Sequence, residues 1–265
     1  MSISRGPSNG DVLQSQAYVT LVTNDDFVMG AEALLLSLRD TGTARQKVVM
    51  VTPAVSTGRR QVLNDLADRI VEVEPLDMPG KERAHVSSWA DVGYTKLRVW
   101  TLTEYSRVVY IDADALVLEN VDDLFDRSVE FAAAPDVFPP DKFNAGVLVL
   151  VPSVAAFEDM RRQSSELPTH DGGDTGFLNS YFSDWYGRSA EARLPFGYNA
   201  QRTLYWFTHE REPGYWEAIR PLKIIHFCSS PKPWQETDKK GDLEFLWWDK
   251  YISSKMGCLE LHMTP

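Results

Sequence analysis

The chain opens with an alternation of apolar runs and helix-forming runs, and this pattern limits its possible folds more than any other feature. Short β-rich runs lie at 18–23 (YVTLVT), 47–52 (KVVMVT) and 70–73 (IVEV). Helix formers fill 30–39, with Gly42 just beyond, and 58–66. Strands that alternate with helices in this way are typical of βαβ units. We therefore predict an α/β fold with a mostly parallel central sheet flanked by helices.

The remaining chain continues this pattern after a break at 77–92, which we expect to be a loop. A predicted helix at 95–105 leads into a strand that ends in Asp112-Ala113-Asp114. Further strands are predicted at 144–151 and 222–227. Further helices are predicted at 153–167 with Ser153 as N-cap, at the segment that follows Asp171 and ends at Tyr181, and at 243–253. No internal repeat or linker divides the sequence.

Two acids interrupt the otherwise apolar run VVYIDADALVL at 108–118. Residues i and i+2 of an extended chain point the same way, so the side chains of Asp112 and Asp114 would lie together. Two carboxylates held close repel unless a cation lies between them or one is protonated. Because carboxylate oxygens suit Mg²⁺ and Mn²⁺, we interpret the pair as metal ligands. The alternative is an acidic turn in which Asp serves as a cap.

Other polar residues follow predicted strands in the same manner. Thr23 and Asn24 follow the first strand, and His226 lies near the end of the last. In open α/β sheets the ligand crevice lies at the carboxyl ends of the strands, so we expect these residues to share it with the two acids. A neutral imidazole beside two carboxylates suits Mn²⁺ better than Ca²⁺ or Zn²⁺; a structural histidine is the alternative. Lys232 is close enough in sequence to offset the charge of a metal-bound diphosphate.

Charge and composition exclude several classes of partner. A net charge of −11 argues against a nucleic-acid binder, which needs a basic face. No apolar run is long enough to span a membrane, and residues 1–16 lack the apolar core of a signal peptide. We expect a flexible leader at 1–16 and one domain at 17–265. Cys228 and Cys258 fit reduced thiols better than a disulfide framework, so we expect a cytoplasmic protein.

Several segments together resemble the glycogenin-type members of glycosyltransferase family 8, which have the GT-A fold. In the family's order they are AYVTLVTNDDFVMGA, YTKLRVWTLTEYSRVVYIDADALVLENVDDLF, FNAGVLVLVPSV, DGGDTGFLN, LPFGYN and HFCSSPKPW. They run from about Ala17 to Trp234. Several independent motifs in one order are far more specific than Asp-x-Asp alone. The resemblance implies a single GT-A (Rossmann-like) domain with a nucleotide-sugar site.

The resemblance also implies the chemistry of that site: transfer of glucose or a related sugar from a UDP-sugar to a hydroxyl, with retention of configuration. It assigns Asp112, Asp114 and His226 to Mn²⁺, with Mg²⁺ as the second candidate. Catalytic roles fall to Asp174, Asp171 and Lys232. Around the donor it places Leu21, Thr23, Asn24, Phe27, Lys96, Asp112, Ala113, Asp114, Asn144, Ala145, Gly173, His226, Ser229 and Lys232. The implied partners are UDP-glucose and a hydroxyl acceptor, and a homodimer is compatible with them.

The sequence departs from the family pattern at residues that matter for substrate. Phe27 replaces a tyrosine, Ala145 replaces a serine, and Thr175 replaces a glutamine near the transferred sugar. At the family's self-glucosylated tyrosine, ungapped counting places Trp206, with Tyr205 one residue away. We interpret Tyr205 as a packed aromatic residue and predict a separate acceptor, a small molecule or a glycan. Self-glucosylation at Tyr205 is the alternative.

Two other classes of protein share features of this sequence. Asp-x-Asp after an apolar strand also begins the active site of haloacid-dehalogenase-like phosphatases. There Thr or Val stands where this chain has Leu116, and the motif usually follows the first strand, so these features argue against this class. A non-catalytic nucleotide-sugar-binding module is supported only by Ala145 and Thr175, and the intact Asp112, Asp114 and His226 set argues against it.

Overall fold

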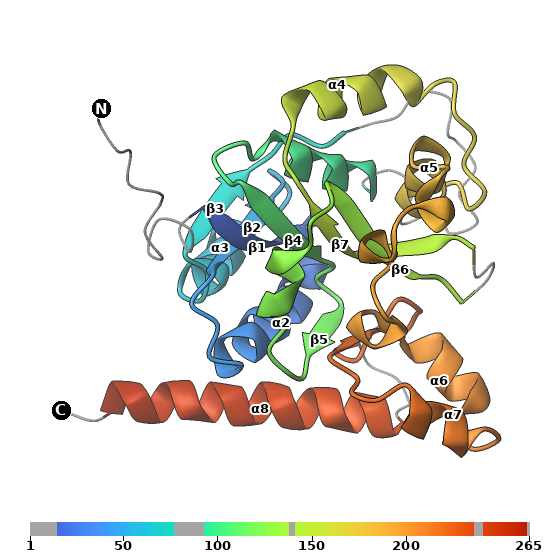
Figure 1. Ribbon diagram of the computed structural model, residues 1–265. Helices are drawn as coiled ribbons and strands as arrows, with labels where there is room; N and C mark the ends of the chain where they lie inside the picture. Colours follow the sequence, from blue (N-terminus) through green and yellow to red (C-terminus); the bar gives the residue numbers. More distant parts are fainter. Residues whose placement is uncertain (1–14, 77–92, 138–140, 236–240, 264–265) are drawn as a thin grey trace, which may run out of the picture.

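A six-stranded sheet with the order β3-β2-β1-β4-β7-β6 forms the centre of the computed structural model, which describes residues 15–76, 93–137, 141–235 and 241–263 (Figure 1). Its strands are β1 (Gln16–Val22), β2 (Gln46–Val51), β3 (Arg69–Glu72), β4 (Arg107–Ile111), β6 (Phe131–Pro135) and β7 (Phe143–Leu150). Strand β1 pairs in parallel with β2 and β4, and β2 with β3. Strand β7 runs antiparallel to β4 and β6. The predicted α/β fold with a mostly parallel sheet is confirmed.

A second sheet of three short strands was not predicted as such. It consists of β5 (Ala115–Val117), β9 (Ile224–His226) and β8 (Ala200–Gln201), in that order. Strand β5 is antiparallel to β9, and β8 is parallel to it. The predicted strand at 222–227 is therefore shorter and belongs to this sheet. The chain passes from the large sheet to the small one between β4 and β5, at Asp112-Ala113-Asp114.

Helices cover both faces of the large sheet. They are α2 (Val28–Asp40), α3 (Thr57–Asn64), α4 (Val154–Gln163), α5 (Asp174–Tyr181), α6 (Arg202–Thr208), α7 (Pro213–Ala218) and α8 (Asp242–Met263). Short 3₁₀ helices are η1 (Asp25–Phe27), η2 (Gly93–Thr101), η3 (Asp122–Asp126), η4 (Trp185–Gly187), η5 (Ala190–Ala192) and η6 (Phe196–Tyr198). The predicted helix at 95–105 is thus a 3₁₀ helix that ends at Thr101. Ser153 caps α4 as predicted, because its side chain accepts a hydrogen bond from the Ala156 N–H at 3.2 Å.

Helix α2 is the middle layer between the two sheets. Its Leu34 and Leu38 pack with β1 and β4 residues, whereas Ala33 packs with Leu116 of β5 and Trp247 of α8. A helix that is apolar all round is buried, and this explains the sequence GAEALLLSL within it. Gly42, with φ of +73°, follows the helix in the left-handed conformation that favours glycine. Helices α4 and α5 lie across the opposite face of the large sheet (Figure 1).

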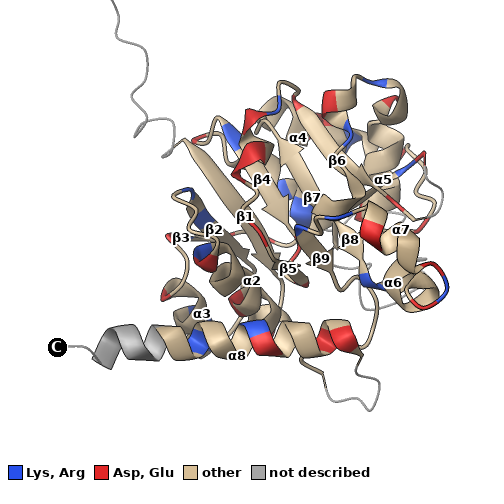
Figure 2. Ribbon diagram, turned by 60° about the horizontal axis from the view of Figure 1, so that its bottom comes forward, with Lys and Arg blue, Asp and Glu red and all other residues tan. Residues whose placement is uncertain are grey.

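The charged residues lie mainly on helices and in loops, and the central strands carry few of them (Figure 2). Among the described helices, none combines the length and the apolar character that a membrane-spanning helix needs. Most of the predicted leader at 1–16 and all of the predicted loop at 77–92 lie outside the described residues. Gln16, assigned to the leader, is the first residue of β1.

Candidate active site

The Asp-x-Asp motif forms a turn between the two sheets rather than the end of an extended strand. The Asp112 N–H donates to the Gly146 carbonyl of β7 at 2.8 Å, and the Ala115 N–H donates back to the Asp112 carbonyl at 3.0 Å. Strand β5 then pairs with β9, and Ala115 lies opposite His226. This pairing brings His226, more than a hundred residues away in sequence, beside the two acids.

Asp112, Asp114 and His226 form a cluster that could hold a metal ion. Each offers one ligand atom, and these atoms all lie within 4.8 Å of one another. The His226 Nε2 atom lies 3.2 Å from Asp114 Oδ1 and 3.8 Å from Asp112 Oδ2. Two carboxylates and one imidazole are a donor set that suits Mn²⁺ and can accept Mg²⁺. The residues present therefore fit the divalent ion that the sequence predicted.

On one side of this cluster lie Lys96, Asp112 and Asp174, which we call the Lys96 side. The Lys96 Nζ atom lies 3.0 Å from Asp112 Oδ1 and 2.6 Å from Asp174 Oδ2, and it donates to the Ala145 carbonyl at 3.0 Å. Burial acts to lower the pKa of Lys96, but the carboxylates of Asp112 and Asp174 raise it above its usual value. Burial raises the pKa of Asp112, and the charge of Asp114 adds to this against the opposing effect of Lys96.

On the other side lie Asp114, His226 and Lys232, which we call the His226 side. The Lys232 Nζ atom lies 2.6 Å from Asp114 Oδ2 and donates to the Phe227 carbonyl at 2.8 Å. Burial acts to raise the pKa of Asp114, but the Lys232 ammonium outweighs it and the pKa is lowered. Both lysines that the sequence placed near the donor are therefore buried against acids of the Asp-x-Asp motif.

An open pocket of about 660 Å³ adjoins the cluster. It is lined by Leu21, Thr23, Asn24, Phe27, Gly93, Lys96, Tyr110, Asp112, Ala113, Asp114 and Asp174. Leu21 lies near the end of β1, and Thr23, Asn24 and Phe27 follow the strand, at the carboxyl edge where the sequence predicted a crevice. The Phe27 ring packs edge-on against Trp234, with 6.0 Å between the centroids. The pocket thus joins an apolar end at Leu21 and Phe27 to a charged end at the cluster.

Besides His226 and Lys232, five predicted site residues are not among the residues that line the pocket: Asn144, Ala145, Asp171, Gly173 and Ser229. The Asn144 Oδ1 atom accepts hydrogen bonds within the protein, and Ala145 is buried. The Asp171 Oδ1 atom accepts from the N–H groups of Gly173 and Gly176, so this carboxylate organises its own loop. The Ser229 Oγ atom accepts from the Arg202 guanidinium at 2.7 Å. The polar side chains among them thus make hydrogen bonds within the protein, whereas Asp174 lines the pocket itself.

Three residues that the sequence analysis did not assign take part in the site. Gly93 and Tyr110 line the pocket, and the Tyr110 hydroxyl donates to Asp112 Oδ1 at 2.8 Å. Asn199, fully buried, contacts the ring of His226. Tyr110 lies two residues before Asp112, so the same period-2 argument that joined the two acids could have found it. Asn199 lay within the family motif LPFGYN, but the sequence gives no sign of what it contacts.

Tyr205 lies on α6 within a group of aromatic rings. Its ring stacks on His209 with 4.2 Å between centroids and meets Trp216 edge-on at 5.0 Å. It is partly buried against the cluster formed by Leu116, Ile225, Phe227, Leu243 and Trp247. The packed environment predicted for this tyrosine is therefore present.

Comparison with known proteins gives the family. The description of the matching family is Glycosyl transferase family 8, and the match covers residues 18–238. The chain belongs to this family. Glycogenin-1 of Homo sapiens is 40% identical over 267 residues, which cover 94% of this chain and 75% of that protein. Galactinol synthase 2 of Solanum lycopersicum is 29% identical over 289 residues, with 93% and 82% covered. The resemblance to glycogenin-type family 8 glycosyltransferases is confirmed.

The fold has clear counterparts among solved glycosyltransferase structures. The galactosyltransferase LgtC, solved in complex with donor and acceptor sugar analogues, matches with a TM-score of 0.65 and 18% identity over 89% of this chain and 95% of that one. This likeness confirms the GT-A fold. A family 8 glycosyltransferase transfers sugar from a nucleotide sugar, so the phosphatase alternative is set aside.

Proposed function

We propose that this family 8 glycosyltransferase transfers glucose from UDP-glucose to a hydroxyl of a separate acceptor, a small molecule or a glycan, with retention of anomeric configuration. The observation that carries the proposal is the convergence of Asp112, Asp114 and His226 beside a pocket that Lys96 lines, with Lys232 buried against Asp114. Paired acids with an imidazole and lysines match the needs of a departing diphosphate, whose negative charge grows as the glycosidic bond breaks.

In this proposal Asp112, Asp114 and His226 would hold Mn²⁺, and the ion would neutralise charge on the diphosphate. Lys232 and Lys96 supply further positive charge from the two sides of the cluster. Each is more than nine-tenths buried, and a charge in a water-poor site acts more strongly than one in bulk water. Loss of one such group typically lowers turnover by about 10²–10³.

The nucleoside of the donor would lie at the apolar end of the pocket, against Leu21, Thr23, Asn24 and Phe27. A phenylalanine ring still offers a flat face to uracil, although it lacks the hydroxyl of the family's tyrosine. The half-buried ring of Phe27 is supported by its edge-on contact with Trp234. This end of the pocket would therefore select for the base by shape and stacking.

The transferred sugar would lie near Asp174. Its carboxylate can stabilise the positive charge of an oxocarbenium-like transition state, or attack as a transient nucleophile. The ion pair with Lys96 at 2.6 Å makes the carboxylate a weaker nucleophile, so we assign it the electrostatic role. The acceptor hydroxyl would then attack on the face that the diphosphate leaves, with a phosphate oxygen as base.

The packing of Tyr205 is the reason for proposing a separate acceptor. A tyrosine that stacks on His209 and Trp216 has to leave this packing before its hydroxyl could enter the pocket. Relatives in the comparison carry names as different as glycogenin, galactinol synthase and inositol phosphorylceramide glucuronosyltransferase, so family membership does not choose among acceptors. Self-glucosylation remains the second candidate because Tyr205 lies one residue from the family's acceptor position.

Intact-protein mass spectrometry after incubation with UDP-glucose and Mn²⁺ tests the proposal. With no acceptor added, water takes the sugar, so we expect release of UDP and free glucose with an unchanged protein mass, and no UDP release from the Asp112→Asn variant. A ladder of added hexoses would contradict the separate acceptor, and a Tyr205→Phe variant that lost the ladder would then identify Tyr205 as the primer. Absence of both UDP and added mass would contradict the proposal and indicate a different donor sugar or a non-catalytic nucleotide-sugar-binding module.

A further inference from the structure

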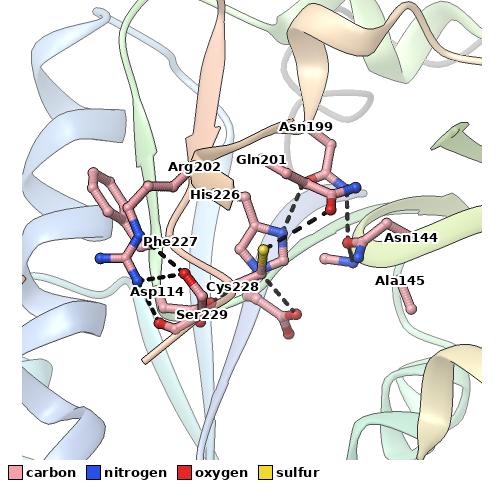
Figure 3. Close-up of polar contacts among 12 residues, drawn as sticks. Asp114, Asn144, Ala145, Asn199, Gln201, Arg202, His226, Phe227, Cys228 and Ser229 are labelled. Atoms are coloured by element: carbon pink, nitrogen blue, oxygen red, sulfur yellow. Dashed lines mark hydrogen bonds and ion pairs between the residues drawn. The ribbon is translucent and has the colours of Figure 1, made fainter. Parts of the chain in front are cut away.

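A chain of hydrogen bonds joins the backbone of β7 to the ring of His226 through two asparagines (Figure 3). The Gly146 N–H donates to Asn144 Oδ1 at 2.9 Å, and Asn199 Nδ2 donates to the same oxygen at 2.9 Å. The other end of the Asn199 amide, Oδ1, lies 2.9 Å from His226 Nδ1. Asn199 is 0% exposed and His226 is 3% exposed, so water has little access to these contacts.

The direction of every bond in this chain follows from its first member. A backbone N–H can only donate, so the Asn144 atom that it meets must be the oxygen. That oxygen can only accept, so Asn199 must face it with its NH₂ group. The Asn199 oxygen is then the atom that faces His226, and because it too can only accept, the proton of the ring must be on Nδ1.

We propose that Asn144 and Asn199 act as a relay that fixes His226 as the Nδ1–H tautomer, so that Nε2 keeps its lone pair for a metal ion; this rests on the proposed metal site. Asn199 is thereby a positioning residue for the metal ligand. The side-chain carbonyl of Asn144, a residue that the resemblance placed near the donor, helps to fix this tautomer because it orients the Asn199 amide.

The relay prevents a hydrogen bond between His226 and Asp114 that would occupy two of the metal-binding atoms. The Nε2 atom lies 3.2 Å from Asp114 Oδ1, within hydrogen-bond reach. With a proton on Nε2, the imidazole would donate to that carboxylate, and the two ligands would satisfy each other. With the proton held on Nδ1, two lone pairs face each other instead. A divalent cation between them removes that repulsion, so the relay makes the cluster favour a cation.

The position of the ring is fixed as well as its proton. A Cβ atom at Gly146 would lie 2.2 Å from His226 Cε1 and 2.4 Å from Nδ1, so the ring packs directly on the β7 backbone. Gly146 thus has two roles: its N–H fixes the orientation of the Asn144 amide, and its lack of a side chain leaves room for the His226 ring. Hydrogen bonds from a second residue to the free nitrogen of a metal-binding histidine typically contribute 10–100-fold to metal affinity, as an order of magnitude.

The first test reads the tautomer without metal. Long-range proton–nitrogen NMR of the full chain labelled at histidine, at alkaline pH, with the His226 signals assigned from a His226→Gln variant, should show a proton on Nδ1 and none on Nε2. The opposite tautomer would overturn the proposal. This reading needs no bound ion and no turnover, so failure of the proposed metal dependence leaves the test intact.

The second test uses matched variants and Mn²⁺ affinity, measured by electron paramagnetic resonance of free Mn²⁺. Asn199→Leu should weaken Mn²⁺ binding by about 10–100-fold and release the tautomer preference, whereas Asn144→Asp, which keeps an acceptor for both donors, should keep the Nδ1 proton. Asn179→Leu is the control, because Asn179 is also buried, at 5% exposed, and among the described residues its hydrogen bonds go to the backbone of Phe143 and Thr175. A folded Asn199→Leu variant with unchanged affinity would overturn the relay, and if that variant fails to fold the wild-type NMR result decides.

Discussion

The two acids of the Asp-x-Asp motif are one residue apart in sequence but lie in unequal surroundings. Asp112, on the Lys96 side, shares its lysine with Asp174, and its pKa is raised chiefly by burial. Asp114, on the His226 side, has a closer lysine at 2.6 Å, and its pKa is lowered although burial opposes this. The side chain of Asp112 is 23% exposed and that of Asp114 only 5%.

The surroundings of Asp112 and Asp114 differ because each acid lies next to a different sheet. The Lys96 side is built by η2, α5 and the end of β4, which belong to the large sheet and its covering helices. The His226 side is built by β9 and the residues after it, next to the small sheet. A short motif therefore carries two electrostatic roles because the chain changes sheets in the middle of it, and the roles can be separated by mutation.

The largest expected effect is a difference in the free energy of unfolding between variants of Asp114 and Asp112. Asp114→Asn should lower the free energy of unfolding by about 3–5 kcal/mol, because it leaves the Lys232 ammonium buried beside a neutral amide. Asp112→Asn should cost much less, because it also removes a carboxylate whose charge is disfavoured by burial. Both variants should lower turnover of UDP-glucose by at least about 10². Urea unfolding with a chelator present measures the first quantity, and UDP release measures the second.

The pH of the unfolding measurement and a control variant are needed to interpret the difference between Asp114→Asn and Asp112→Asn. The pKa of Asp114 is lowered in the folded protein, so its contribution is complete above the unfolded pKa of about 4 and is lost as the pH falls through the folded value. Unfolding is therefore compared near neutral pH. Asp68→Asn, which breaks the exposed pair with Lys47, should have almost no effect. Equal losses for Asp112→Asn and Asp114→Asn would show that the two sides do not differ.

The sequence predicted several strands of the structure and missed others. The strands at 18–23, 47–52 and 108–111 carry long apolar runs between polar boundaries, and they were found. Strands β5 and β8, of three and two residues, are too short to show any period, so the small sheet was missed. The acids and His226 were recognised as candidate ligands by residue type and position, but their unequal electrostatics depends on lysines that only the fold brings near.

Asn199 is the clearest example of a site residue whose contacts could not be predicted from the sequence. Its partners Asn144 and His226 lie 55 and 27 residues away in sequence, and nothing local distinguishes it from a turn residue. Tyr110 is different, because it shares the strand and the period of Asp112. Buried hydrogen bonds between distant segments satisfy polar groups that have lost water, and a single sequence gives no record of such pairs.

A smaller effect should follow from Gly146→Ala, whose added atom would meet His226 directly. The added Cβ atom would overlap the ring of His226 at 2.2 Å, and the ring must shift because the backbone of β7 is held within the sheet. We expect Mn²⁺ affinity to fall by about 10-fold or more. Gly58→Ala is the control, because a Cβ atom there would meet nothing within 4 Å. Retention of full Mn²⁺ affinity by Gly146→Ala would show that the ring is free to move without loss of the site.

The smallest effect should come from Thr175→Val, which acts on the Lys96 side alone. Thr175 Oγ1 accepts the N–H of Ala145 at 3.3 Å, and the carbonyl of Ala145 accepts from Lys96. Valine keeps the shape but leaves the N–H without its acceptor, which should cost about 1 kcal/mol of unfolding free energy, whereas Thr175→Ser should cost less because the hydroxyl stays. Isothermal titration should show weaker binding of UDP-glucose with unchanged Mn²⁺ affinity. A loss of Mn²⁺ affinity as large as that of Gly146→Ala would mean that the two sides of the cluster are coupled, since the described hydrogen bonds of Thr175 go to Ala145 and Asn179.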